Sequence, residues 1–444
     1  MEKQWSEMSP EEKRAKRLEP YLNPDKSKFK NAKAAKLYIE RLNRMLKMYM
    51  NQVPDRVPVT LPAGNFPLYH NGGNLKKGMY DYKFLRESYS RFLQDFKDYT
   101  DNMPGPALTH YAPAMEMIGM NFMKWPGYGL GDDVTTYQFV EGEYMTADEY
   151  DHLIRDPSDF AFRVQMPRQY GVAKPFAKMA PYSTLLGMNK GFISPFMDPE
   201  IADAFQTLID AGKENQKWAK ELSIYSREVA AEGFPALRGG MSLAPFDFIG
   251  DALRGTQGVL LDMFRQPDKL LAAIDAITPI IIKYSIDTCN ATGGVMVHFP
   301  LHKGDDTFMS DKQFEKFYWP SLKKYADALI AEGIMPNLFA EGKYTRRLNY
   351  IADFPKGWVH WIFDQTNMAE AKRMVGANCS ISGNIPTSIM VTAKPKEVKE
   401  YCRKLIETCA PGGGYMLAGG ASATETNADN LKVLMEAALE YGKY

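Results

Sequence analysis

The sequence is poor in cysteine: its 444 residues include four, at positions 289, 379, 402 and 409. No two of them form a Cys-x-x-Cys pair, which argues against a disulfide-stabilised secreted scaffold and against a structural zinc knuckle. Long apolar runs are also missing. The longest, at residues 277–282, is far too short to span a bilayer, and the charged residues 1–16 lack the apolar core of a signal peptide. A soluble, cytoplasmic protein is expected.

An excess of charge of either sign is absent as well. Lysine plus arginine and aspartate plus glutamate number 54 each, so the formal net charge is zero. This balance gives no electrostatic basis for binding nucleic acid or an anionic membrane surface. The sequence therefore predicts neither of these partners, and any partner must be recognised by local features.

Glycine-rich nucleotide loops are the third absence. No Gly-x-Gly-x-x-Gly and no Walker sequence follows the first predicted strand. The three glycines at 412–414 precede a predicted strand instead of a helix, which indicates a turn. An open, doubly wound nucleotide-binding sheet is thereby disfavoured.

Short apolar runs, each followed by a longer amphipathic stretch, dominate the chain from residue 56 onward. Strands that alternate with helices indicate βαβ units and a parallel sheet. This number of repeats favours a closed (β/α)8 TIM barrel, an α/β fold that can exceed 400 residues with insertions. The predicted strands are residues 57–61, 236–238, 294–299, 335–340, 358–363, 379–382 and 415–418.

Two regions depart from this alternation. Residues 1–50 place apolar residues at helical spacing among lysines and arginines, which predicts an N-terminal helical extension that packs on the barrel or on a second copy. Residues 101–230 are irregular and rich in proline and aromatic residues, which predicts an insertion over the strand ends. The predicted domains are the extension, 1–50, and the barrel, 51–444.

Several segments, in this order and spacing, resemble the uroporphyrinogen decarboxylase superfamily, which has the same barrel fold. The resemblance covers most of the chain after residue 50 and is greatest to the methyltransferase members. The segments are 137–145 (YQFVEGEYM), 148–151 (DEYD), 156–157 (DP), 245–247 (PFD), 253–255 (LRG), 314–320 (FEKFYWP), 383–386 (GNIP) and 428–430 (ADN).

The resemblance implies two possible chemistries. True uroporphyrinogen decarboxylases hold the porphyrin carboxylates with an arginine-rich segment after the first strand, where this chain has 61–66 (LPAGNF) with no arginine. The other branch moves methyl groups to or from a corrinoid protein. Its thiol-methylating members bind zinc through His-x-Cys-Gly and a distant cysteine; this chain has 339–342 (FAEG) and 419–421 (GGA). Any metal here would have a harder, oxygen-rich site.

Candidate catalytic residues follow from the rule that TIM-barrel active sites lie at the carboxyl ends of the strands. Two interpretations of the residues there stay open. One is a zinc site formed by His298, His302 and Glu341 with an open fourth position. The other is metal-free proton donation by Glu341 or Asp364 with a raised pKa, or a structural ion pair there. His360 is a further catalytic candidate, although its place on a strand face with Trp358 and Ile362 favours a hydrogen-bonded core histidine.

Substrate-binding candidates lie in two places. Asn65, Tyr69, His110 and Trp125 follow the first strand, and the aromatic residues among them would suit a flat apolar substrate such as a methoxylated ring. Asn384 follows the predicted strand 379–382.

The sequence thus predicts a methyltransferase that takes a methyl group from a small donor, a methyl ether or methoxylated aromatic, and gives it to a corrinoid protein. No corrinoid-binding Asp-x-His-x-x-Gly motif is present, so the cobalamin must arrive on a partner. The alternatives are a lyase or decarboxylase acting on a small non-porphyrin acid, and a barrel that only binds. A homodimer is expected from the resemblance.

Overall fold

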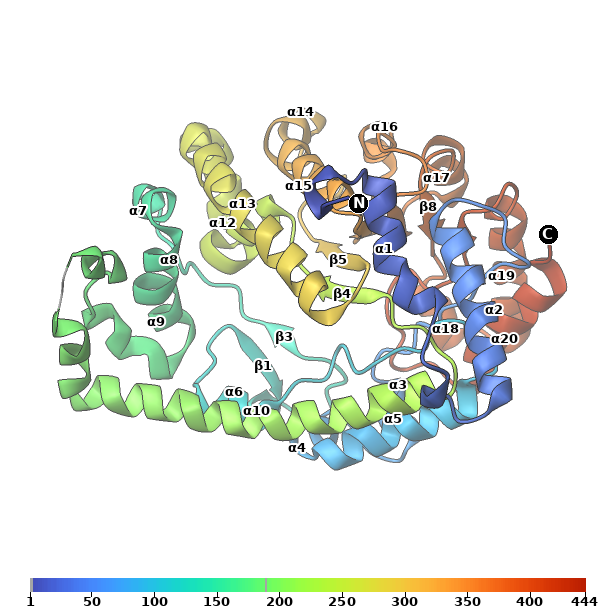
Figure 1. Cartoon of the computed structure of the whole chain (residues 1–444), viewed down its shortest axis with the longest axis horizontal. Helices are drawn as coiled ribbons and strands as arrows, with labels where there is room; N and C mark the ends of the chain where they lie inside the picture. Colours follow the sequence, from blue (N-terminus) through green and yellow to red (C-terminus); the bar gives the residue numbers. More distant parts are fainter. Residues whose placement is uncertain (1–2, 188–189) are drawn as a thin grey trace.

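The centre of the molecule is a sheet of six parallel strands in a computed structural model that describes residues 3–187 and 190–444. Each strand pairs with the next one along the sequence, and helices lie between successive strands (Figure 1). This is the arrangement that successive βαβ units produce. The strands are β4 (Arg238–Met241), β5 (Met296–Leu301), β6 (Met335–Ala340), β7 (His360–Phe363), β8 (Ser380–Ser382) and β9 (Tyr415–Met416).

The helices that cover these strands carry their apolar residues on the side facing the sheet. Leu322, Tyr325 and Leu329, for example, are all buried and recur every three or four residues in one helix. These helices are α11 (Pro245–Ile249), α12 (Gly255–Arg265), α13 (Pro267–Thr292), α14 (Asp311–Gln313), α15 (Trp319–Ala331), α16 (Leu348–Ile351), α17 (Met368–Met374), α18 (Thr387–Thr392), α19 (Pro395–Cys409) and α20 (Ala428–Tyr441).

Two further parallel segments extend the sheet. Val59 forms a parallel bridge with Leu417, just after β9, and Thr60 forms one with Asn102. Residues 57–61 and 100–103 therefore take the first and second strand positions of the predicted (β/α)8 TIM barrel. Within residues 3–187 and 190–444, no bridge joins Asn102 to β4. The second position went unrecognised in the sequence because its residues 100–102 are polar.

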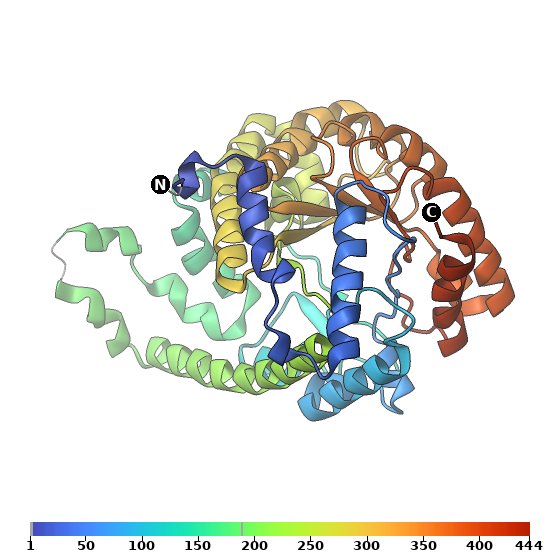
Figure 2. The same ribbon diagram turned by 45° about the vertical axis from the view of Figure 1, so that its right-hand side comes forward.

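The N-terminal extension closes the amino-terminal end of the barrel. Its helices α1 (Pro10–Leu22) and α2 (Ala32–Tyr49) run side by side across that end (Figure 2). Their arginines bind carbonyl groups just ahead of the strands: Arg14 donates to Gly357 O at 2.8 Å, and Arg41 donates to Glu232 O at 2.9 Å. A Cβ on Gly233 would lie 2.2 Å from Ala34 O, so only glycine permits this close approach. The extension therefore packs on the barrel, which is one of the two roles predicted for it.

A buried ion network joins α2 to the first two strand positions. Asp101, 2% exposed, accepts hydrogen bonds from Arg44 at 2.7 Å, from Arg56 at 2.7 and 2.9 Å, and from the backbone N–H of Val59 at 2.9 Å. All of the bonding capacity of this carboxylate is satisfied, which is the condition under which a buried charge is stable.

The first half of the barrel contains short helices and the predicted insertion. Helix α10 spans 33 residues and extends well beyond the barrel (Figures 1 and 2). Its end packs on α5, since Arg86 donates to Glu221 at 2.7 Å, so α10 belongs to the barrel and the insertion ends before it. The helices and strands of this first half, including the insertion, are α3 (Phe66–His70), α4 (Leu75–Tyr80), α5 (Tyr82–Phe96), α6 (Ala112–Met117), β1 (Met123–Pro126), β2 (Gly129–Leu130), β3 (Gln138–Phe139), α7 (Tyr150–Arg155), α8 (Pro157–Phe160), α9 (Met166–Gln169) and α10 (Pro199–Ala231).

The segment around β3 crosses the carboxyl-terminal side of the barrel. Tyr144 donates its backbone N–H to Leu253 O at 2.7 Å, beyond the end of β4. Thr135 donates to Glu425, beyond β9, at 3.2 Å. The insertion therefore lies over the strand ends as predicted. Among the residues that the structure describes, no helix is both long and apolar enough to cross a membrane.

Candidate active site at the carboxyl ends of the strands

Three neighbouring strands, β5, β6 and β7, carry the residues of the candidate site in layers. Alternate residues of a strand face the same side, and the register aligns His298, Asn337 and His360 across the three strands. Steps of two residues therefore create three layers that face the barrel interior. The lower layer is His298, Asn337 and His360, the middle layer is Pro300, Phe339 and Ile362, and the upper layer is His302, Glu341 and Asp364.

The upper layer contains a carboxylate–histidine–carboxylate group. His302 Nδ1 lies 2.6 Å from Asp251 Oδ2, and its Nε2 lies 3.6 Å from Glu341 Oε2. Lys303 Nζ lies 2.9 Å from the other oxygen of Asp251 and donates to Thr256 Oγ1, also at 2.9 Å. The side chains of His302 and Glu341 remain 34% and 53% exposed, so a molecule entering from this end of the barrel can reach them.

The protonation of this group follows from its contacts. Burial alone would lower the pKa of His302, but the hydrogen bond and charge of Asp251 outweigh it and raise the pKa to about 9. Burial opposes ionisation of Asp251, yet His302 and Lys303 hold its pKa below the usual value. Burial raises the pKa of Glu341 against the attraction of His302. At neutral pH, His302 is therefore an imidazolium with Nε2–H directed toward Glu341.

A buried carboxylate fixes the position of His302. Asp247, on α11, accepts the backbone N–H groups of His302 at 3.0 Å and Lys303 at 3.1 Å, and the hydroxyl of Tyr318 at 2.8 Å. Burial raises the pKa of Asp247. These bonds to Asp247, called the backbone clamp below, order the loop that follows β5. The imidazole of His302 is therefore held in place by backbone as well as side-chain contacts. Asp247 and Asp251 were not among the predicted site residues, although segment 245–247 carried part of the family resemblance.

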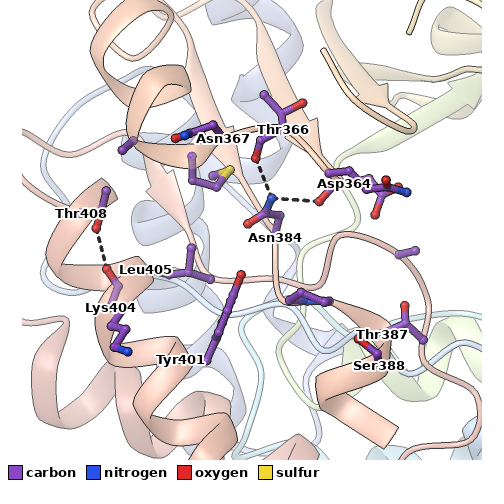
Figure 3. A pocket seen from close by; sticks show the side chains of 15 residues that line it. Asp364, Thr366, Asn367, Asn384, Thr387, Ser388, Tyr401, Lys404, Leu405 and Thr408 are labelled. Atoms are coloured by element: carbon purple, nitrogen blue, oxygen red, sulfur yellow. Dashed lines mark hydrogen bonds between the residues drawn. The ribbon is translucent and has the colours of Figure 1, made fainter. Parts of the chain in front are cut away.

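Asp364 lies at the end of β7 beside the other upper-layer residues. Its Oδ2 accepts the backbone N–H of Gly342 at 3.2 Å, and its charge contributes to the raised pKa of Glu341. Asn384 donates to the carbonyl oxygens of Asp364 at 2.9 Å and Thr366 at 2.8 Å (Figure 3). The predicted substrate-binding Asn384 thus orders the loop that carries Asp364.

A cavity adjoins these two residues on the outer side of the strand ends. Its volume is about 830 Å³, and it lies between β7, β8 and the helices α17 to α19 (Figure 3). Asp364, Asn384, Tyr401 and Lys404 are among the residues that line it. The side-chain nitrogen of Asn384 is occupied by its two bonds to the loop. Only its other side-chain atoms can contact a molecule in this cavity, and its assignment to substrate binding stays a prediction.

The predicted catalytic residue His360 lies at the other end of the barrel. It is 1% exposed, and its two ring nitrogens are 2.9 Å from Ser380 Oγ and 3.0 Å from Ser382 Oγ. The ring of Tyr49 packs edge-on against it from α2, with centroids 5.0 Å apart. Burial lowers the pKa of His360 to about 3. This geometry matches the alternative interpretation of His360, a hydrogen-bonded core histidine.

The predicted zinc ligands are only partly brought together. His302 and Glu341 are neighbours, but His298 lies two layers lower, where burial and the charge of Arg238 lower its pKa to about 3. In residues 3–187 and 190–444 no three histidine, cysteine, aspartate or glutamate side chains are placed to hold a metal ion. Catalytic zinc takes three protein ligands. This pair does not fit that requirement, and no chemical step is derived through a metal.

The predicted aromatic wall divides into two parts. Trp125 is fully buried, stacks on Tyr128 at 4.4 Å and donates to Tyr80, so it is core of the insertion. His110 packs on Tyr137 at 4.8 Å, and Tyr137 is close enough to Glu341 for that charge to raise its pKa further, after burial. His110 and Tyr137 therefore border the upper layer. Tyr137 was not predicted.

Asn65 and Tyr69 complete the predicted set. Asn65 is fully buried, donates to Thr135 O at 3.2 Å and accepts from Thr109 at 3.0 Å. These bonds hold the insertion against the loop after residues 57–61, and they occupy both ends of the amide. Burial raises the pKa of Tyr69.

The fold defines a TIM-barrel protein, and the acid–base cluster is a candidate active site in the position where that fold carries one. Residues 194–441 match the family model of uroporphyrinogen decarboxylase (URO-D), and the chain belongs to this family. It is also similar to the solved structure of a methyltransferase from Methanosarcina mazei, with a TM-score of 0.58 and 15% identity over 90% of this chain and 98% of that chain. At this identity the similarity shows a shared fold. No curated protein matches the sequence.

Proposed function

We propose that this protein is a methyltransferase that takes a methyl group from the oxygen of a small donor and passes it to a corrinoid held by a partner protein. The observation that carries the proposal is the proton-donating group His302–Asp251, with Glu341 beside it, at the open end of the barrel. Membership of the URO-D family and the fold shared with a methyltransferase support it.

Removal of a methyl group from an ether leaves an oxygen anion that needs a proton. His302 supplies it from Nε2–H, and Asp251 stabilises the imidazolium until the transfer takes place. Glu341 lies 3.6 Å from Nε2, and its charge helps to keep the proton on this nitrogen until the donor oxygen takes it. The methyl group leaves as the proton arrives, the product is an alcohol or phenol, and His302 recovers its proton from solvent.

The corrinoid, when its partner protein is docked, supplies a cobalt nucleophile for the methyl group. The chain's own contribution is an accessible mouth: the upper-layer side chains keep a third to a half of their exposure. The segment around β3 and Tyr137 covers one side of that mouth and limits the entry of water to the donor oxygen.

The test is an assay of the purified chain with methoxybenzene and reduced cobalamin as acceptor, followed by the absorbance of the methylated corrinoid. Glu341→Gln is the test variant, and Glu436→Gln, on the exposed face of α20, is its control. We expect turnover that requires the acceptor and falls about 10²–10⁴-fold in Glu341→Gln only, the usual contribution of acid–base catalysis. Turnover of small carboxylic acids with release of CO₂ and no acceptor would instead establish the lyase alternative.

A further inference from the structure

The tip of the insertion exposes large apolar side chains to solvent. This tip consists of the two short helical segments Tyr182–Leu186 and Lys190–Met197, which lie at the end of the insertion farthest from the barrel (Figures 1 and 2). Six of its apolar residues keep between 43% and 93% of their exposure. They are Tyr182, Leu186, Phe192, Ile193, Phe196 and Met197.

A small aromatic core fixes both segments of the tip. The rings of Phe162 and Phe176 stack with centroids 4.8 Å apart, and Phe176 contacts Phe205 of α10 at 5.0 Å. Tyr182 packs on Phe162 at 5.2 Å, and Phe196 packs on Phe205 at 5.1 Å. The two segments are therefore attached to one core, and the apolar surface that this core does not bury forms the outside of the tip.

The exposed apolar area of the tip is larger than a monomer normally carries. At about 150–200 Å² for a fully exposed side chain of this size, the six residues expose about 600–800 Å². The largest apolar patch of a typical monomer covers about 300–600 Å². Each partner in a stable protein–protein interface buries about 800 Å². The tip alone therefore supplies most of one side of such an interface.

The charges around the tip nearly balance. Residues 171–200 contain three lysines and two acidic residues, and Lys178 lies 3.3 Å from Asp198 and 2.5 Å from Glu200. An anionic membrane surface attracts clusters of four or more basic residues, and this segment has no such cluster. Two copies of a nearly neutral apolar surface meet without like-charge repulsion, so the tip is complementary to itself, as a two-fold contact requires.

We propose that the tip of the insertion is an interface between two copies of this chain, which pair tip to tip about a two-fold axis. Pairing buries the apolar residues of both tips against each other. Helix α10, with 33 residues, is about 50 Å long and joins the tip to the barrel. The interface contains no residue of the candidate active site, and the inference is independent of the proposed reaction.

The experiment is sedimentation equilibrium of the full chain at micromolar concentrations. We expect the wild type to have the mass of two chains. The double variant Leu186→Asp/Phe192→Asp should raise the dissociation constant at least about 100-fold, because it places unpaired carboxylates in the interface. Phe264→Asp is the control, since it replaces a similarly exposed aromatic residue on α12, and it should leave the dimer intact. A monomeric wild type, or a dimer that survives the double substitution, would overturn the proposal.

Disulfide cross-linking gives a second measurement that leaves the apolar surface largely unchanged. All four native cysteines are buried, so an introduced cysteine at the tip is the accessible thiol of its variant. Leu186→Cys, Phe192→Cys and Met197→Cys are made one at a time. Mild oxidation should link two copies covalently in at least one of them, whereas Phe264→Cys should remain unlinked. Failure of all three tip variants to cross-link would contradict a two-fold contact between tips.

Two other occupants of the tip would give different results. If the tip contacts a membrane, the wild-type chain should be monomeric and should sediment with vesicles of phosphatidylcholine and phosphatidylserine. If it contacts a different protein, the purified chain should be monomeric and should not bind these vesicles. Either result would reject the pairing of tips.

Discussion

His302 Nδ1 lies 2.6 Å from an oxygen of Asp251, and this ion pair sets the charge of the only histidine in the upper layer. A neutral histidine at the same position would have an Nε2 that accepts a proton. The pairing reverses this role, because the carboxylate stabilises the protonated ring. The proton-donating chemistry proposed above depends on this contact.

Asp251→Asn should return His302 toward ordinary behaviour. Loss of the carboxylate removes both the hydrogen bond to a charge and the attraction that oppose burial, so the pKa should fall from about 9 to below 6.5. Histidine-selective NMR titration can measure it, since the chain has only six histidines. The exposed Asp353→Asn is the control. A His302 pKa near 6.5 in the unaltered protein would contradict the structure.

The same shift predicts how His302→Gln changes stability with pH. The folded-state pKa exceeds the unfolded value of 6.5, so the stabilisation is complete below that pH and is lost as pH rises through about 9. We expect His302→Gln to lower the free energy of unfolding at pH 6 by about 1 kcal/mol, after allowance for the partial exposure of the pair. The difference should vanish by pH 10. Urea unfolding at both pH values measures it.

Asp247→Asn should weaken both the fold and the reaction. An asparagine amide cannot accept the two backbone N–H groups of His302 and Lys303 as the carboxylate does, so at least one buried donor loses its partner at a cost of about 1–3 kcal/mol. Displacement of His302 should lower kcat about 10- to 100-fold, with KM little changed. Tyr318→Phe, which removes only the third bond to Asp247, should have a smaller effect on kcat. Equal kcat losses in both variants would show that the backbone clamp has no special role.

His360→Asn tests the reassignment of a predicted catalytic residue to the core. The folded protein resists protonating His360 until about pH 3, while the unfolded chain accepts the proton near pH 6.5. As the pH is lowered from 6.5 toward 3, the free energy of unfolding of the wild-type protein should therefore decrease by up to about 1.4 kcal/mol per pH unit. The decrease should be smaller in His360→Asn. The kcat of its folded fraction should stay near wild type. A loss of kcat comparable to that of Glu341→Gln would restore His360 to the site.

Asp101→Asn should detach α2 from the barrel. The substitution leaves Arg44 and Arg56 facing each other around a neutral group, and breaking a buried ion network in this way costs about 3–5 kcal/mol. The midpoint of urea unfolding should fall accordingly, whereas the exposed Asp353→Asn should leave it unchanged. Limited proteolysis should then cleave within residues 1–50 first. Undiminished protease resistance of this segment would contradict the prediction.

The alternation of strands and helices was predictable because parallel strands buried on both faces are short and apolar. The predicted 335–340 is β6 without change, and the predicted 379–382 differs from β8 by one residue. The strand-end rule likewise selected the residues of the upper layer, His302, Glu341 and Asp364. The order of residues along a strand shows directly which residue follows its carboxyl end.

Other features depend on contacts that no local pattern reveals. Asp247 and Asp251 follow β4, yet they reach the loop after β5, so their role requires the pairing of the two strands. Strand position 100–103 is polar because Asp101 is neutralised by arginines distant in sequence. Trp125 and Asn65 looked like a substrate surface by residue type, but each has its partners within the protein. Residue type alone does not distinguish these cases.

The layered arrangement also bears on how this barrel diverges among relatives. Buried polar side chains, apolar side chains and the acid–base cluster occupy successive two-residue steps along the same three strands, and hydrogen bonds between backbones hold those steps in register. A substitution at 300, 339 or 362 can therefore change which molecule fits without moving the backbone that carries 302, 341 and 364. Substitutions in one layer can therefore change the substrate specificity of such a barrel and retain its reaction, and substitutions in another layer can change the reaction and retain the specificity.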